Sequence, residues 1–377
     1  MRIAIVTETF LPSTDGIVTR LTHSIKWLVK HGHSVDIIAP DLGVNEYEGA
    51  RVLGVPAHTL FFYKSKKFAL PHKVVETYLK EINPDVVHIV NPALVGFSGV
   101  YYGKKLKIPI VASYHTNVAQ YLDYYHLSPF KPLLWWYFRK LHNQAIINLC
   151  TSQTVQYELV ERKFNNVHHW KRGVDTDSYH PSNYDDMMRN RLTNNQSDKT
   201  LLLYVGRIAA EKEIEKIKSV LTKRDDVCLA IVGDGPHRAQ LEKHFSGSNT
   251  VFTGFMHGHE LAQAYASSDI FVFPSTTETL GLVILEAMAS GLPIVAADSG
   301  PTREQIHDGS NGMLYKKQDP KSFEEAVLSL CNPHKRDKMK ILARQEAEHH
   351  GWDGQSQQLL SFYKMAITDN QKWKALA

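Results

Sequence analysis

The chain has 377 residues, of which 43% are hydrophobic, and 43 Lys and Arg against 39 Asp and Glu give it a formal net charge of +4. This length allows two domains that each bury a core, and the ordinary hydrophobic content excludes a disordered or fibrous protein. The small charge excess, without a recognised binding motif, argues against a nucleic-acid partner.

Cysteine usage, apolar runs and the distribution of charge indicate the compartment. Cys150, Cys228 and Cys331 lie far apart without metal-ligand spacing, which predicts a reduced, cytoplasmic protein with buried thiols. The start, MRIAIVTETF, is too short an apolar run for a signal peptide, and no run of eighteen apolar residues exists, so we expect no membrane span. Residues 1–190 carry 21 Lys and Arg against 16 Asp and Glu, which favours peripheral contact with an anionic surface on the inner face of the cell membrane.

The first stretch of the chain predicts a strand, a loop and a helix. RIAIVT at residues 2–7 is a buried-strand pattern, residues 17–31 have a helical period, and the loop PSTDGI between them contains Gly16. This is the position of a phosphate loop, but no G-x-G-x-x-G is present, so a nicotinamide or flavin dinucleotide loses its main support. A plain turn glycine is the alternative for Gly16.

Further strands follow at HGHSVDIIAP, DVVHIVNP and IPIVASYH. The last of them ends in Ser113-Tyr114-His115-Thr116-Asn117, and polar residues directly after a buried parallel strand lie where α/β sheets bind ligands. His115 is therefore a candidate site residue, with a structural histidine as the alternative.

Two stretches interleave aromatic and cationic side chains, TLFFYKSKKFALP and residues 121–142. Such mixtures fit the headgroup region of a bilayer or a cleft for a lipid acceptor. Aromatic rings packed inward, in an irregular loop and in a core helix, are the alternative. The candidate acceptor or membrane residues are Phe61, Phe62, Lys66, Lys67, Tyr121, Trp135 and Trp136.

The second half opens a second sheet after a crossing between domains. Residues 168–199 are polar and lack a hydrophobic period, and LLLYVGRI then predicts a strand that ends at Arg207, with Lys212 five residues later. Two cations at this spacing can converge on one diphosphate, Arg through its planar fork and Lys as a point charge. A solvated surface helix is the alternative for Lys212.

The run FPSTTETLGLVILEAMASGLP has a strand before it and a strand after it. Glu278 lies just before Leu280-Gly281-Leu282, where backbone N–H groups and the positive end of a helix macrodipole favour a phosphate. Glu286 lies inside that helix, roughly 8 Å along the axis from Gly281. A nucleoside diphosphate sugar suits this layout, although two Glu eight apart also occur on solvated helix faces.

This run resembles the Glu-x7-Glu motif of the retaining glycosyltransferases of family 4. LLYVGRIAAEK, AIVGDGP, VFTGFM and TETFLPSTDGIVTRL follow the order of that family, so the resemblance covers nearly the whole chain. SYHTN and the N-terminal pattern are most similar to the branch of sulfolipid synthases and related bacterial glycolipid glycosyltransferases.

The resemblance implies an α/β protein of the GT-B fold, with two Rossmann-like domains facing across a cleft. Residues 1–180 would form the acceptor domain, residues 181–354 the nucleotide-sugar domain, and residues 355–377 a helix that returns to the first domain. Arg172-Gly173-Val174-Asp175 stands where the family commonly has Asn-Gly-Val-Asp, so the role of Arg172 is left open.

The implied activity is transfer of a sugar, with retention and an α linkage, from a nucleotide-diphosphate sugar, with a UDP-sugar favoured. The acceptor would be a hydroxyl of a membrane lipid such as diacylglycerol or a glycolipid. VDTD, with Asp175 and Asp177, is the nearest approach to an Asp-x-Asp metal run, so neither metal nor cofactor is expected. The alternatives are GDP-mannose or another donor, a soluble or polysaccharide acceptor, a non-catalytic GT-B partner protein, or an NDP-sugar epimerase.

In the family, Glu278 would hold sugar hydroxyls, Glu286 the ribose and His115 the sugar, while Arg207 and Lys212 meet the leaving diphosphate. The predicted catalytic residues are His115, Arg207, Lys212 and Glu278. The predicted donor-binding residues are Gly16, Gly206, Gly233, Gly254, Phe255, Met256, Thr279, Leu280, Gly281, Leu282 and Glu286.

Overall fold

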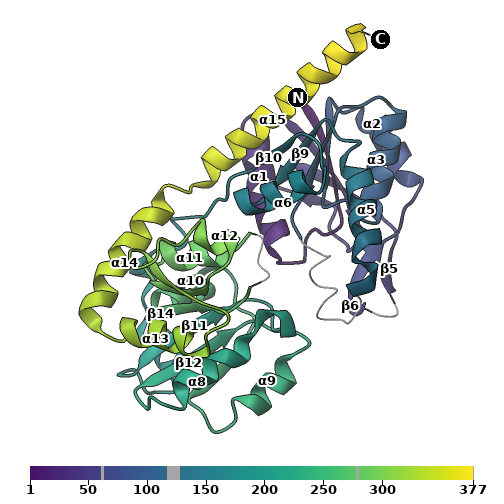
Figure 1. The fold of residues 1–377 in the computed structure, drawn as a ribbon. Coiled ribbons are helices and arrows are strands. Elements are labelled where there is room, and N and C mark those ends of the chain that lie inside the picture. The colour runs from purple at the N-terminus through teal and green to yellow at the C-terminus, as the bar shows by residue number, and fades with distance from the viewer. Residues whose placement is uncertain (61–62, 117–127, 277–279, 377) are drawn as a thin grey trace. The chain divides into compact units, whose positions relative to one another are not determined.

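A computed structural model describes residues 1–60, 63–116, 128–276 and 280–376 of the protein. The chain divides into two compact units, one formed by Met1–Arg172 with Trp352–Ala377 and the other by Gly173–Gly351 (Figure 1). Each unit is built on its own parallel sheet with helices on both faces.

The sheet of the first unit consists of β1 (Arg2–Thr7), β2 (Ser34–Pro40), β3 (Glu46–Tyr47), β4 (Ala50–Val55), β7 (Val86–Val90), β8 (Ile110–Tyr114), β9 (Ile147–Cys150) and β10 (Val167–His169). Their order is β10-β9-β8-β7-β1-β2-β4-β3, and every neighbouring pair is parallel except β3 with β4. Strands β7, β8 and β9 are buried at every position, which explains their continuous apolar sequences.

Alternate residues of these strands face two different layers of helices. Ile3 and Ile5 of β1 pack with the apolar faces of α1 and α15, whereas Ala4 and Val6 pack with α2, α3 and α5. The helices of this unit are α1 (Gly16–Lys30), α2 (Val74–Ile82), α3 (Val95–Lys105), η1 (Ser128–Phe130), α5 (Lys131–His142), α6 (Gln153–Glu161) and α15 (Trp352–Leu376). Helix α15 follows the second unit in sequence but lies against α1 (Figure 1), so the expected return of the C-terminal helix is confirmed.

The second unit has a six-stranded parallel sheet of β11 (Thr200–Val205), β12 (Val227–Val232), β13 (Thr250–Gly254), β14 (Ile270–Phe273), β15 (Ile294–Ala297) and β16 (Gly312–Tyr315). The strand order is β13-β12-β11-β14-β15-β16. One face is covered by α7 (Asp186–Leu192), α10 (Gly258–Ala266), α11 (Leu282–Ala289) and α14 (Pro333–Glu348). The other is covered by η4 (Ile214–Ile217), α8 (Lys218–Leu221), α9 (Arg238–His244) and α13 (Pro320–Leu330). The short helices η2 (Pro181–Asn183), η3 (Ala210–Lys212) and α12 (Gly300–Arg303) lie in loops.

Each sheet reverses its strand order at one place. In the first unit the chain moves outward from β1 to β2 and β4, and later outward from β7 to β8, β9 and β10 on the other side. In the second unit the reversal lies between β11 and β14. Ligands of open α/β sheets bind beside such switch points, at the carboxyl ends of the strands. The two doubly wound sheets confirm the predicted fold class, two Rossmann-like domains in one chain.

Two segments differ from the sequence-based expectation. The stretch TLFFYKSKKFALP at residues 59–71, for which an irregular loop is the alternative to a headgroup contact, contributes instead to two antiparallel strands, β5 (Ala57–Leu60) and β6 (Tyr63–Ala69). Residues 168–199, predicted to lack a hydrophobic period, include the end of β10 and all of α7. Met188 and Leu192 of α7 are buried in the second core, and a helix of seven residues is too short to show its period in sequence.

No helix in the part of the chain that the structure describes is both long and apolar enough to cross a bilayer.

We expect Leu359→Ala to destabilise the protein by about 2–5 kcal/mol, because this fully buried side chain joins α15 to the core shared with α1. Urea unfolding of the full chain measures the change. Lys364→Ala, at an exposed position of the same helix, is the control. Equal stability of the two variants would show that α15 is not part of this core.

Candidate functional site

Glycines end three neighbouring strands of the second sheet and bring their backbones into close contact. The Gly206 N–H donates to Val232 O at 3.0 Å, and the Gly233 N–H donates to Gly254 O at 2.8 Å. A Cβ on Gly233 would lie 2.0 Å from Gly206 O, and a Cβ on Gly235 would lie 2.2 Å from Ile208 O. The predicted donor-binding glycines Gly206, Gly233 and Gly254 therefore lie together at one edge of the sheet.

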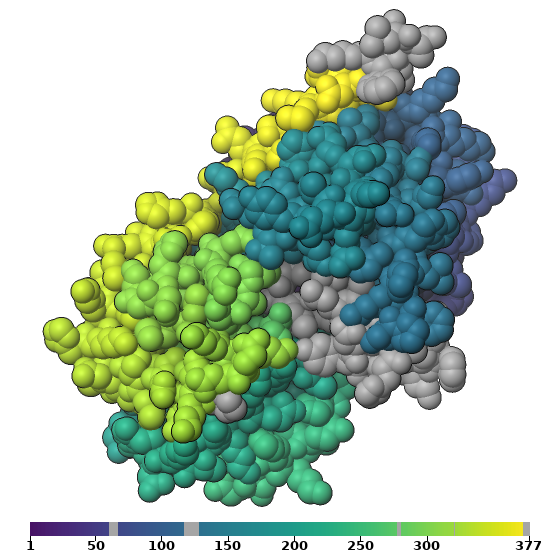
Figure 2. Space-filling model, viewed as in Figure 1, coloured from purple at the N-terminus to yellow at the C-terminus, as the bar shows by residue number. Residues whose placement is uncertain are grey.

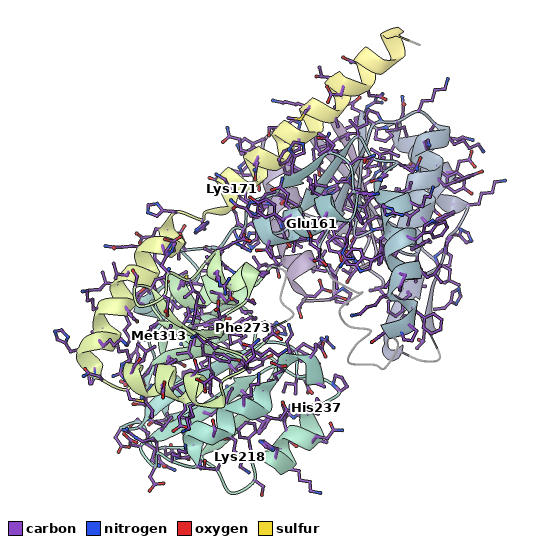
Figure 3. The ribbon with its side chains drawn as sticks, in the orientation of Figure 1. Glu161, Lys171, Lys218, His237, Phe273 and Met313 are labelled. Atoms are coloured by element: carbon purple, nitrogen blue, oxygen red, sulfur yellow. The ribbon has the colours of Figure 1, made fainter. Side chains whose placement is uncertain are left out.

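The two predicted cations follow β11 at this edge. Arg207 lies at the end of the strand and forms an ion pair with Glu211, whose side chain is buried. Lys212 ends η3, and its Nζ lies 6.0 Å from the ring centroid of Phe273, the last residue of β14 (labelled in Figure 3). The short η3 therefore places Lys212 beside the switch point between β11 and β14, rather than on the solvated surface helix of the alternative.

Helix α11 begins just after β14. Gly281 precedes it with φ of 63°, a left-handed conformation that glycine adopts without strain, and the adjoining Leu280 and Leu282 are buried. Gly291, with φ of 76°, follows its end. The predicted residues Glu278 and Thr279 lie outside the described part of the chain.

Glu286 points to a buried tyrosine from inside α11. The Tyr265 hydroxyl of α10 donates to Glu286 Oε2 at 2.9 Å. Burial raises the pKa of Glu286 to about 7, and the hydrogen bond from Tyr265 opposes part of that rise. A carboxylate near neutrality can accept from hydroxyl groups such as those of a ribose.

The strand β13 ends at Gly254, where φ is 79°, and leads into Phe255 and Met256. The Phe255 ring is exposed and stacks on His257 with 6.1 Å between ring centroids. The Met256 side chain is buried in the core, so only its backbone could meet a base.

In the first unit, His115 follows β8 and is held from two directions. The backbone N–H groups of His115 and Thr116 both donate to Asn91 Oδ1 at 3.2 Å, and Asn91 directly follows β7. The His115 ring lies 2.9 Å from Ser113 Oγ through Nε2. Burial, with a further effect of the Arg20 guanidinium, lowers the pKa of His115 well below its ordinary value, so the imidazole is neutral.

Glu8 is a residue of this edge that the sequence reasoning did not select. Its carboxylate follows β1 and accepts from the N–H groups of Ala93, Leu94 and Gly96 at 2.8–2.9 Å and of Val95 at 3.3 Å. Burial raises its pKa although these donors oppose the rise. The same rule that selected His115, a polar residue straight after a buried strand, would have found Glu8.

Gly16 opens α1, but the amides beside it already have an anionic partner. Asp15 Oδ1 accepts from the N–H groups of Ile17 and Val18 at 3.1 Å each. Further along α1, fully buried Arg20 stacks on the Trp170 ring at 3.5 Å and donates to the carbonyls of Trp170 and Lys171 at 2.6 Å. Burial lowers the pKa of Arg20, and the charge of Arg172, which is also buried, lowers it further.

The residues predicted to contact an acceptor or a membrane differ in exposure, and some of them lie outside the described part of the chain. Trp136 of α5 is half exposed, whereas Trp135 packs against Tyr114 and Phe164 as the core alternative expected. Lys67 is exposed in β6. Phe61, Phe62 and Tyr121 lie outside the described residues, as does the side chain of Lys66.

Two Rossmann-like units with a C-terminal helix that returns to the first define the GT-B fold, the architecture of one large class of glycosyltransferases. Residues 14–178 match the family model described as Glycosyltransferase Family 4, and residues 189–346 match the model described as Glycosyl transferases group 1. The chain belongs to glycosyltransferase family 4.

Several relatives cover most of the chain. The Arabidopsis thaliana sulfoquinovosyl transferase SQD2 is 37% identical over 90% of this chain and 68% of its own. A GDP-mannose-dependent alpha-mannosyltransferase of Mycolicibacterium smegmatis is 34% identical over 97% of this chain and 98% of its own. The alpha-monoglucosyldiacylglycerol synthase of Streptococcus pneumoniae is 29% identical over 100% of this chain and 88% of its own.

Among solved structures, Anabaena HepE in complex with UDP and glucose superimposes with a TM-score of 0.80. The alignment covers 97% of this chain and 99% of that chain at 17% identity, so it supports the fold alone.

We expect Glu286→Gln to raise the unfolding temperature at pH 8 and to leave it nearly unchanged at pH 5. The pKa of Glu286 is raised from 4.5 to about 7, so between these values the native protein keeps a proton that the unfolded chain releases. The stability contributed by this proton is present at low pH and is lost as the pH rises through 7. Thermal unfolding without ligand measures the difference, with exposed Glu325→Gln as the control. A gain that is the same at both pH values would contradict the raised pKa.

Proposed function

We propose that the protein is a retaining glycosyltransferase that moves a sugar from a UDP-sugar to a lipid hydroxyl and forms an α linkage. The observation that carries the proposal is the position of Arg207 and Lys212 at the β11/β14 switch point, beside the segment that leads into α11. Arg207 and Lys212 together with the start of a helix suit a diphosphate.

The chemical step places negative charge on the departing diphosphate. Arg207 is pre-oriented by Glu211, and Lys212 is held beside Phe273, so both cations are in place before charge develops. Preorganised donors of this kind stabilise a transition state without the need to reorganise. We propose that these side chains meet the charge without a divalent cation and without any other cofactor. Retention is carried over from the family motif.

The donor proposal rests on the relatives and on Glu286. The preference for a UDP-sugar is carried over from the family resemblance. The mycobacterial relative is named for GDP-mannose, which remains the alternative donor. Glu286 would accept from the ribose, which both donors share. Thermal-shift measurements with UDP-glucose and GDP-mannose distinguish them, because the tighter ligand stabilises more at equal concentration.

We expect Arg207→Ala and Lys212→Ala each to lower kcat about 100- to 1,000-fold, the range for removal of one preorganised donor of charge stabilisation. Transfer is measured on purified protein with and without EDTA, and activity should survive chelation. Lys243→Ala, an exposed cation on α9, is the control. Near-normal turnover of both variants would contradict the site, and loss of activity with EDTA would contradict metal independence. A wild-type protein that binds donor but transfers nothing would indicate the non-catalytic alternative.

A lipid acceptor is supported by the surface of α3 and α5. Exposed apolar side chains stand on both helices and on the preceding η1, and residues 128–142 form part of the surface in Figure 2. An open pocket of about 390 Å³ is lined mainly by apolar atoms of α3 and the end of α5. Lys104 and Lys105 also line it, and Lys105 pairs with Glu76. We name this region the α3–α5 surface, comprising Phe97, Tyr101, Lys104, Lys105, Phe130, Leu133 and Trp136.

Apolar rings beside lysines suit the boundary between headgroups and acyl chains of an anionic membrane. The name of the pneumococcal relative specifies diacylglycerol, which agrees with such an acceptor. We therefore propose peripheral attachment through the α3–α5 surface.

We expect the protein to float with liposomes that contain anionic lipid, and Leu133→Ala with Trp136→Ala to weaken this binding about tenfold through lost apolar burial. Flotation at several fractions of anionic lipid measures the binding. Tyr157→Ala, at an exposed aromatic residue of α6, is the control. Liposome binding that does not depend on the fraction of anionic lipid, or equal binding by the control and the double variant, would contradict the proposal.

A further inference from the structure

A chain of four buried polar side chains runs from the C-terminal helix to His115. The Tyr363 hydroxyl of α15 lies 2.8 Å from His88 Nδ1, His88 Nε2 lies 2.8 Å from Ser113 Oγ, and Ser113 Oγ lies 2.9 Å from His115 Nε2. Each of the four residues is at most 3% exposed. All four belong to the first unit, in which β7 and β8 are paired neighbours and α15 packs over them.

Every group in this chain is electrically neutral. Burial lowers the pKa of His88 to about 3 and lowers the pKa of His115 as well, with Arg20 acting in the same direction on both. Burial raises the pKa of Tyr363, so the phenol keeps its hydrogen. Each imidazole therefore has one nitrogen that donates and one that accepts.

Neutrality allows three arrangements of the three hydrogen bonds. In one of them Ser113 Oγ accepts from the Nε2–H groups of both imidazoles, and the Ser113 hydrogen is stranded, because His88 and His115 are the only hydrogen-bond partners of this hydroxyl among the described residues.

In the remaining two arrangements the three bonds run in one direction or in the other. In one direction the Tyr363 hydroxyl donates to His88 Nδ1, His88 Nε2–H donates to Ser113 Oγ, and the Ser113 hydroxyl donates to His115 Nε2. In the other direction every bond is reversed, and the Tyr363 oxygen accepts from His88 Nδ1–H. The Tyr363 hydrogen would then need another acceptor, and His88 is the only hydrogen-bond partner of this hydroxyl among the described residues.

We propose that Tyr363, His88 and Ser113 are positioning residues that fix the proton of His115 on Nδ1. The first direction forms all three hydrogen bonds and uses both hydroxyl hydrogens. The reversed direction leaves the buried hydroxyl hydrogen of Tyr363 without an acceptor among the described residues. A stranded buried donor costs about 1–3 kcal/mol. In the first direction the buried donor that needs a partner outside these four side chains is the His115 Nδ1–H, so this direction is favoured when an oxygen, such as one of a bound ligand, meets that hydrogen.

In this arrangement each ring nitrogen of His115 has a fixed hydrogen-bonding role. Its Nε2 accepts from Ser113, and its Nδ1–H is a hydrogen-bond donor. In the proposed glycosyltransferase, on which this step rests, a neutral donor at His115 suits an oxygen of the donor sugar, because it binds without adding a charge. Tyr363, which lies 248 positions after His115 in sequence, thus determines which ring nitrogen of His115 carries the hydrogen.

Nitrogen NMR of the full-length protein labelled at the histidine ring nitrogens reads the proton positions directly. His115 and His88 signals are assigned by their loss in His115→Gln and His88→Gln. We expect the proton on Nδ1 of His115 and on Nε2 of His88. A proton on Nε2 of His115, or a mixture of both forms, overturns the proposal, and this reading requires no activity.

The Ser113→Ala variant removes the hydrogen bonds that connect His88 with His115 and provides a second test of the proton positions. We expect the His115 proton to be no longer confined to Nδ1, while His88 keeps its Nε2 proton because Tyr363 still donates to Nδ1. Ser98→Ala, a buried serine of α3 outside the chain, is the control and leaves both tautomers unchanged. An unchanged His115 in Ser113→Ala would show that Ser113 does not set its tautomer.

Transfer assays separate the positioning role from the proposed activity. The amide of Asn stands near the place of Nδ1, and that of Gln near the place of Nε2, so we expect His115→Asn to keep about tenfold more kcat/KM than His115→Gln, the worth of one hydrogen bond. Equal or reversed losses would contradict a donor role for Nδ1. Failure of the proposed activity itself would appear in the wild-type protein, with the NMR result unaffected.

Discussion

The backbone hydrogen bonds among β11, β12 and β13 hold the carboxyl ends of these strands so close that a side chain on Gly233 has no space. This close approach allows only glycine at position 233 of this edge. It also fixes where β11 ends, and hence where Arg207 and Lys212 start. Glu211 and Phe273 then orient the two cations toward the point at which the strand order reverses. The geometry of the candidate donor site thus depends first on the register of these strands, and only then on the individual side chains.

The two units treat negative charge differently. In the first unit the amino ends of α1 and α3 are already neutralised by Asp15 and Glu8 from the same chain. The nearby imidazole of His115 is held neutral by its surroundings. Cations beside the start of a helix are found at the switch point of the second unit. In the proposed function, the diphosphate is therefore assigned to the second unit, where Arg207 already pairs with Glu211, and neutral hydroxyl groups of a sugar or an acceptor are assigned to the first unit.

Local patterns predicted what local interactions determine. Buried strands, the glycine turns and the polar residues after strands were visible in sequence because each depends on a few adjacent residues. Helix α7 was missed because seven residues show no period. Glu8 was missed although its position after β1 was a usable signal. The pairing of Tyr363 with His88 could not be predicted, because it joins residues 275 positions apart through tertiary packing alone.

The position of α15 has a consequence for the order of events during synthesis. Residues 1–172 leave the ribosome before the second unit, yet one face of their sheet packs partly against α15, which is translated after the second unit. The second unit, which is continuous in sequence, has all its strands and helices beforehand. The nascent first unit therefore carries a partly uncovered apolar face until α15 is made, and the second unit can complete its core before the first unit does.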